Sequence, residues 1–176
     1  DYFLWHMKII TNSIMFKKAF LNDKELFSNK IKKGQEFEFF TRLFFKIKPK
    51  QYYIIKEPMF LYRVHKNSIT HQNQKYNFGY KESEAYSLNK NLKRALLINN
   101  KKVAQSAYRL LINLFNKSLK NKHNYNQKFI LKSLSEAGIK NSFLIKMFLN
   151  IAIKLNNLVN ITNTKWEKVS KKIPII

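Results

Sequence analysis

The sequence predicts an α/β fold, with a mixed sheet and a helix laid on it, followed by a helical region. Short apolar runs alternate with turns in the first part of the chain, and the pattern changes near residues 72–79. Beyond that point apolar residues recur at helical spacing, with no proline until Pro174. We therefore expect a mixed α/β part at residues 1–75 and a basic helical part at 76–176. With 176 residues and 45% hydrophobic content, the chain can bury a core of about one domain.

The predicted strands lie in two stretches rich in β-branched and aromatic residues. Residues 7–16 form the first, which a polar interruption at Thr11 to Ser13 can divide into a strand pair. Asn22 and Asp23 then supply a turn. Residues 52–65 form the second stretch, and Pro58 lies within it. Because proline has no N–H for a ladder, we expect two strands or a bulged edge strand there.

A helix is predicted between these stretches, and several more follow. Gly34 supplies the entry turn of the first helix, whose apolar residues recur at helical spacing: Phe37, Phe40, Leu43, Phe44 and Ile47. Clusters of Asn, Lys and Gly separate the later helices, which we expect at residues 82–98, 101–119, 127–137 and 141–159.

The last of these helices is amphipathic. Polar residues follow one another at i, i+4, i+8 and i+11, namely Lys146, Asn150, Lys154 and Asn157. They leave a wide apolar face of Phe143, Leu144, Met147, Phe148, Ile151 and Leu155. This face would suit packing in the core or docking in a membrane interface, and the pattern does not separate the two. It does not suit a transmembrane span, which needs about 20 mainly apolar residues.

The charge of the chain points to a polyanionic partner. Lys and Arg number 34 against 10 Asp and Glu, a net charge of +24. Specific nucleic-acid readers favour arginine for its bidentate geometry, whereas the basic residues here are mostly lysine, as AT-rich coding would also produce. We therefore expect no specific nucleic-acid partner, and an anionic membrane surface is the favoured polyanion.

Cysteine is absent, which excludes disulfides and cysteine-based zinc sites and suits a reducing compartment. The chain begins at Asp1 without a signal peptide, so we expect a fragment that starts inside a larger protein.

Three short segments carry the strongest functional signal. They read SIMFKK at residues 13–18, GQEFEFFTRL at 34–43 and EPMFLYRVHKNSIT at 57–70. Their order and intervals resemble the C-terminal half of the catalytic domain of family 2 glycosyltransferases, which are inverting enzymes of the GT-A fold. The resemblance covers roughly residues 9–71, and the third segment is its most specific part.

This resemblance implies a partial GT-A sheet with flanking helices and a particular chemistry. A sugar would pass with inversion from a nucleotide-sugar donor to a hydroxyl of a cell-surface glycan or lipid-linked acceptor. The family's general base is the aspartate of a Gly-Glu-Asp motif, and its position falls on Glu36, with Gln35 in place of the preceding glutamate. Glu38 is the fallback base. A carboxylate at a helix start is also favoured by the helix dipole alone.

The same resemblance implies roles for His65 and Arg63, and further candidates lie on the acceptor side. His65 would lie near the donor diphosphate and a divalent metal, Mn²⁺ or Mg²⁺, and Arg63 would pair with a phosphate, or with Glu57 or Glu36. On the acceptor side the candidates are Trp5, Ser13 and Gln35. Trp5 and Tyr2 would stack on a sugar ring, although aromatic residues near a strand are more often core. The other histidines, His6, His71 and His123, gain no such support.

The Asp-x-Asp motif by which the family holds its metal and donor does not occur in the chain. We therefore expect the donor-binding half, with most of the metal ligands, to be missing, and the helical part to hold the enzyme peripherally on the cytoplasmic face of the cell membrane. Two alternatives remain open. One is a non-catalytic basic module that binds membrane or nucleic acid, and the other is a degenerate transferase inactivated by the change to Gln35 and Glu36.

Overall fold

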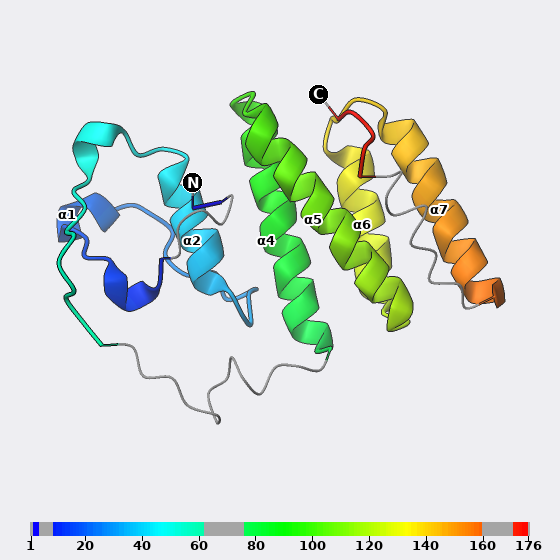
Figure 1. The fold of residues 1–176 in the computed structure, drawn as a ribbon, viewed down its shortest axis with the longest axis horizontal. Helices are drawn as coiled ribbons and strands as arrows, with labels where there is room; N and C mark the ends of the chain where they lie inside the picture. The colour runs from blue at the N-terminus through cyan, green and yellow to red at the C-terminus, as the bar shows by residue number, and fades with distance from the viewer. Residues whose placement is uncertain (1, 4–8, 62–75, 160–170, 176) are drawn as a thin grey trace.

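The computed structural model describes residues 2–3, 9–61, 76–159 and 171–175, with the side chains of 157–159 left out. Within these residues the chain folds as six α-helices and two short 3₁₀ helices, without a strand (Figure 1). In chain order they are η1 (Thr11–Ser13), α1 (Lys18–Leu21), α2 (Gln35–Phe44), η2 (Pro49–Gln51), α4 (Phe78–Leu97), α5 (Lys101–Lys120), α6 (Asn124–Glu136) and α7 (Ser142–Val159).

The predicted mixed sheet is therefore wrong for the part of the chain that the structure describes, and so is the GT-A fold that it implied. Residues 9–16 hold only the short helix η1 between irregular segments. Residues 52–61 have no regular structure, although Tyr52 has extended dihedral angles of −140° and 157°. β-Branched and aromatic residues favour an extended backbone, but a strand also needs a neighbour to hydrogen-bond with. The ends of both predicted stretches, at 7–8 and 62–65, lie outside the described residues.

The four helices predicted after residue 76 are present, with shifted boundaries. α4 begins four residues earlier than expected, at Phe78, because the side chain of Asn77 accepts a hydrogen bond from the Tyr80 N–H at 3.0 Å. α6 begins at Asn124 rather than at residue 127. The links after α4 and α5 and the one before α7 contain left-handed residues, Asn99, Lys122 and Asn141.

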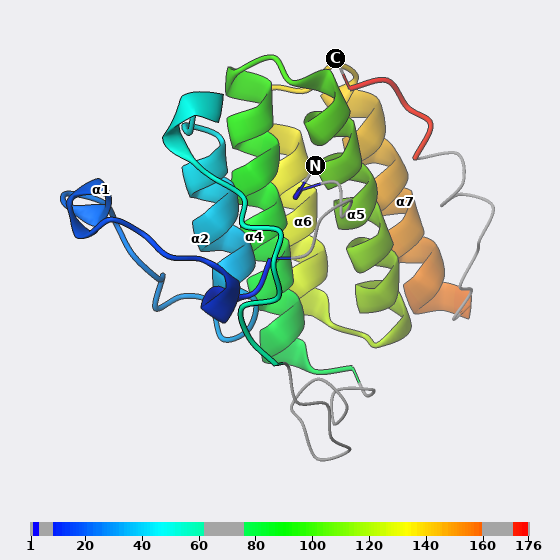
Figure 2. The ribbon, with the colours of Figure 1, turned by 60° about the vertical axis from the view of Figure 1, so that its left-hand side comes forward.

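The larger of two hydrophobic cores lies among α4, α5, α6 and α7, which stand side by side in both ribbon views (Figure 1, Figure 2). α5 supplies its centre, and its large fully buried side chains include Tyr108, Leu111, Ile112 and Phe115. They recur at i, i+3, i+4 and i+7, which is the spacing that places side chains on one face of a helix. Burying each large apolar side chain is worth about 1.5–3 kcal/mol.

The smaller core is aromatic and gathers around α2. Phe39, Phe40 and Leu43 are buried at its centre, and Phe16 contacts the rings of Phe39 and Phe40. On another side of α2, Phe37 packs against the larger core. Helix α2 therefore lies between the two cores, beside α4 (Figure 2).

Candidate functional site

The candidate site is the start of α2, where the sequence predicted a catalytic carboxylate. Gly34 is the N-cap residue and adopts a left-handed conformation, with φ of 78° and ψ of 28°. A side chain is rarely tolerated in this conformation, and glycine lets the chain turn sharply into the helix. α2 then begins at Gln35, so that Glu36 and Glu38 both lie in its first turn.

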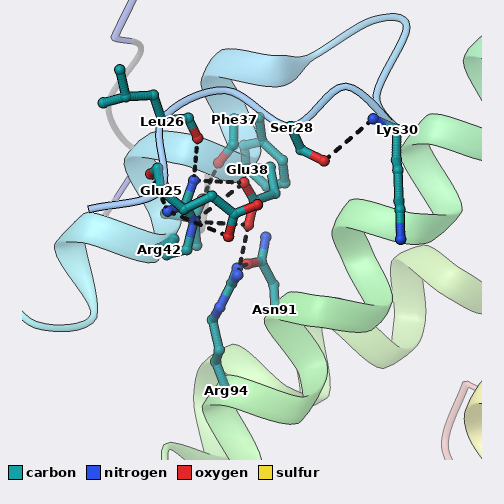
Figure 3. Close-up of polar contacts among 10 residues, drawn as sticks. Glu25, Leu26, Ser28, Lys30, Phe37, Glu38, Arg42, Asn91 and Arg94 are labelled. Atoms are coloured by element: carbon teal, nitrogen blue, oxygen red, sulfur yellow. Dashed lines mark hydrogen bonds and ion pairs between the residues drawn. The ribbon is translucent and has the colours of Figure 1, made fainter. Parts of the chain in front are cut away.

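Glu38 is buried, and two arginines neutralise its carboxylate (Figure 3). Arg94 on α4 donates from Nη2 to Oε1 of Glu38 at 2.6 Å. Arg42, one turn further along α2, donates from Nε to the same oxygen at 3.2 Å. Arg94 also donates to the side-chain oxygen of Asn91 at 2.8 Å. A buried charge is tolerated when it is paired and hydrogen-bonded in this way.

Arg42 extends this network to the loop before α2. Its guanidinium donates to the carbonyl oxygens of Glu25 and Leu26, the latter at 2.6 Å. A second bond crosses to α4 nearby, from the Lys32 N–H to the hydroxyl of Ser83 at 2.8 Å. The polar contacts of Glu38 and Arg42 therefore fix the loop, α2 and α4 relative to one another.

Glu36 has a different environment. Its side chain is half-buried, and its carboxylate has no ion pair or hydrogen bond to another residue of the described part of the chain. Its charge acts on Tyr2, whose pKa is raised to about 12, mainly by burial and further by Glu36. A negative charge disfavours the phenolate, so Glu36 and burial raise the pKa of Tyr2 in the same direction.

The ring of Tyr2 belongs to the aromatic core. It packs edge-on against Phe44 with ring centroids 5.4 Å apart, and also against Phe37 and Phe40. Of the two roles that the sequence left open for Tyr2, this geometry favours core packing over stacking on a sugar.

The other predicted site residues are engaged locally or lie outside the described part. Gln35 donates from Nε2 to the carbonyl of Ile31 at 2.8 Å, which supports the entry to α2. Ser13 donates its hydroxyl to the carbonyl of Ile10 at 2.7 Å, within η1. Three residues lie outside the described part: Trp5, Arg63 and His65. The structure thus brings Gln35, Glu36 and Glu38 together at one helix start, and the remaining assignments stay predictions.

The described residues contain no cluster of His, Asp or Glu that could hold a metal ion. The described residues alone therefore do not supply a set of metal ligands, and we assign no step to a metal. The expected metal stays a prediction that involves His65 and residues beyond the described part.

Sequence reasoning missed a second polar cluster, around His123. This buried side chain has its Nε2 atom 3.0 Å from Glu82 on α4 and its Nδ1 atom 2.9 Å from the Tyr76 hydroxyl. The Tyr76 hydroxyl is in turn 3.1 Å from that of Ser118 on α5. These contacts join the starts of α4 and α6 to the end of α5. One feature of the sequence indicated this cluster. His123 lies directly before a helix, in a turn rich in Lys and Asn.

Comparison of the chain with protein-family models, with curated proteins and with solved structures finds no match. The resemblance to family 2 glycosyltransferases therefore depends on the three short sequence segments alone.

Proposed function

We propose that the chain supplies the acceptor-side residues of an inverting glycosyltransferase and that Glu36 is its general base. In this reaction the acceptor hydroxyl attacks the anomeric carbon of a nucleotide-sugar, and the bond from that carbon to the diphosphate oxygen breaks. The nucleoside diphosphate leaves with the bonding electrons, and Glu36 takes the hydroxyl proton. General-base catalysis of this kind contributes about 10²–10⁴-fold to a rate.

The observation that carries this proposal is the contrast between the two carboxylates of α2. Glu38 is buried and held by Arg42 and Arg94, so a substrate hydroxyl would have to displace an arginine to reach it. Glu36 is half-exposed in the same helical turn and is not paired with a described residue. A base must come within hydrogen-bond reach of the hydroxyl, which favours Glu36.

The proposed partners are those that the resemblance to family 2 glycosyltransferases implies. The donor is a nucleotide-sugar, and the acceptor is a cell-surface glycan or a lipid-linked glycan at the cytoplasmic face of the membrane, where the protein would bind peripherally. None of the described helices combines the length and the apolar character needed to cross a bilayer. A strongly basic chain is attracted to anionic lipid, which supports the peripheral location.

The test measures release of nucleoside diphosphate from UDP-glucose, UDP-galactose and UDP-N-acetylglucosamine by the full-length gene product, with Mn²⁺ or Mg²⁺ present. We expect Glu36→Gln to lower turnover by about 10²–10⁴-fold while circular dichroism and thermal unfolding stay unchanged. Glu36→Asp should retain part of the activity, because it keeps a carboxylate.

The matched control is Glu136→Gln, which removes an exposed carboxylate on α6 and should leave turnover unchanged. Equal turnover by the wild type and Glu36→Gln would overturn the assignment of the base. A wild-type protein that turns over none of these donors would favour the degenerate transferase or the basic binding module.

A further inference from the structure

Helix α7 has one face in the core and another that is open. Ile145, Leu149 and Ala152 are buried against the bundle. The opposite side carries five large apolar side chains that are exposed, which we call the outer face of α7: Phe143, Leu144, Met147, Ile151 and Leu155. Phe143 is 77% exposed, and the other four are 41–46% exposed. The side of α7 that packs in the core is therefore not the apolar face that the sequence pattern indicated, most of which is exposed.

The outer face has a basic border. Lys146 and Lys154 are exposed on the same helix, and Lys140 is exposed directly before it. α7 contains no acidic residue, and in the sequence from residue 101 to residue 159 the only one is Glu136. The surface therefore combines large apolar side chains with positive charge.

This combination is what a helix needs in order to lie in the interface of an anionic bilayer. Phe, Leu, Ile and Met side chains enter the boundary between headgroups and acyl chains, and lysines extend along it to reach the phosphates. Anionic headgroups add electrostatic attraction for each lysine near the surface. α7 lies at the edge of the bundle, with α6 on its inner side and no described helix beyond it (Figure 1).

We propose that the outer face of α7 docks on an anionic lipid surface with the helix axis parallel to the membrane. A second copy of the chain fits this face poorly. Symmetric pairing would bring Lys146 and Lys154 of both copies together with no acidic residue of α7 to neutralise them. A nucleic-acid backbone would leave the apolar side chains without a partner, because phosphates pair with the lysines alone.

This inference names the surface behind the peripheral location proposed above, but it does not need the transfer reaction. Its test measures lipid binding alone, so a failure here and a failure of the Glu36 assignment are distinguishable.

The absence of cysteine makes a site-specific reporter straightforward. Met147→Cys, labelled with the polarity-sensitive dye NBD, reports on the outer face, and Leu97→Cys reports on an exposed apolar position at the end of α4. Both proteins are mixed with phosphatidylcholine vesicles that contain or lack phosphatidylglycerol. We expect a blue shift and a rise in NBD emission at position 147 only, and only with phosphatidylglycerol.

The contribution of lysine charge to vesicle binding is tested with two double variants. Lys146→Gln with Lys154→Gln should weaken binding to the anionic vesicles by about fivefold for each lysine. Lys90→Gln with Lys93→Gln removes the same charge from exposed positions on α4 and should change binding less than twofold. Circular dichroism establishes that both pairs keep their helices.

Three results would overturn the proposal. One is a change of NBD emission that is equal at positions 97 and 147, and another is an equal loss of binding for the two lysine pairs. The third is an emission change at position 147 that depends on protein concentration in the absence of vesicles, which would identify the outer face as an interface between copies.

Discussion

Arg94 Nη2 lies 2.6 Å from Glu38 Oε1, and this contact joins α4 to α2 through two residues that are 56 positions apart in the sequence. Arg42 completes the pairing from within α2. The arrangement divides the acidic start of α2 into a structural carboxylate, Glu38, and a more accessible one, Glu36. Glu38 therefore helps to orient α2 against α4, whereas the proposed catalysis depends on Glu36, another residue of the same turn.

Glu38→Gln should destabilise the protein. The substitution keeps the shape of the side chain but removes the charge that pairs with Arg94, and it leaves Arg42 only the exposed carboxylate of Glu25, 4.0 Å away. Loss of a hydrogen-bonded charge at such a site costs about 1–3 kcal/mol. Urea unfolding followed by circular dichroism measures the free energy of unfolding.

Glu136→Gln is the control for this experiment. It removes one partner of the exposed Lys132–Glu136 pair, whose atoms are 3.9 Å apart. We expect a change within about 0.5 kcal/mol, because exposed pairs contribute little. A double-mutant cycle tests the contact itself. The double variant Glu38→Gln with Arg94→Met should lose less free energy of unfolding than the two single variants lose in sum. Strict additivity would show that the contact between Glu38 and Arg94 does not stabilise the protein in solution.

Gly34→Ala should also lower the free energy of unfolding. No atom lies within 4 Å of the position that a Cβ would occupy, so the cost comes from the left-handed backbone alone. That cost is about 1–2 kcal/mol for a residue other than glycine. Gly34→Asn should lose less, because asparagine tolerates this conformation better.

The matched substitution is Gly79→Ala in the first turn of α4. There the backbone is helical and the nearest atoms belong to the flexible side chain of Lys32. We expect no loss of stability, since alanine favours a helix more than glycine does. If both alanine variants lost stability equally, backbone strain would not explain the role of Gly34.

Stability should fall at alkaline pH in part because of Tyr2. The pKa of Tyr2 is raised from the ordinary tyrosine value of 10.0 to about 12 in the folded chain, so the folded state holds the phenolic proton more tightly than the unfolded state does. The contribution is complete below pH 10 and is lost as the pH rises from 10 towards 12. Urea midpoints for wild type and Tyr2→Phe, measured across this range, should show a shallower decline in the variant. Tyr125→Phe, on an exposed residue of α6, should keep the wild-type decline.

Asn100→Ala should destabilise α5 from its start. The Asn100 side chain accepts a hydrogen bond from the Val103 N–H at 3.1 Å and caps the helix that forms the centre of the larger core. Loss of such a cap costs about 0.5–2 kcal/mol. Asn124→Ala, at an exposed position in the first turn of α6, is the comparison and should cost less. Thermal unfolding by circular dichroism separates the two variants.

The helical half of the fold was predictable because its signal is local. Apolar residues at helical spacing, with asparagines at the boundaries, indicate α4 to α7 without knowledge of what they pack against. The sheet prediction failed for the opposite reason. Residues 52–61 include several types that favour an extended backbone, but a strand also needs a partner elsewhere in the chain, and local propensity does not report whether one exists.

The candidate site was also predictable only in its local part. Gly34 and the acidic residues after it predicted a helix start that carries a carboxylate, and α2 begins there. Which carboxylate is buried was not predictable, because Arg94 lies on a distant helix and its pairing with Glu38 depends on how α2 and α4 meet. In a chain whose basic residues are mostly lysine, an isolated arginine was a usable clue to a fixed ion pair.

The exposed segment at residues 52–61, which has no regular structure, bears on how the protein behaves at high concentration. Tyr53, Ile54, Met59 and Leu61 are all more than half exposed on a backbone without a strand partner. Exposed apolar segments with high β-propensity can pair with copies of themselves and begin aggregation. Lys56, Glu57 and Pro58 interrupt the run with two charges and a residue that cannot donate to a ladder. Charged residues and proline in such positions generally oppose self-association of an apolar segment.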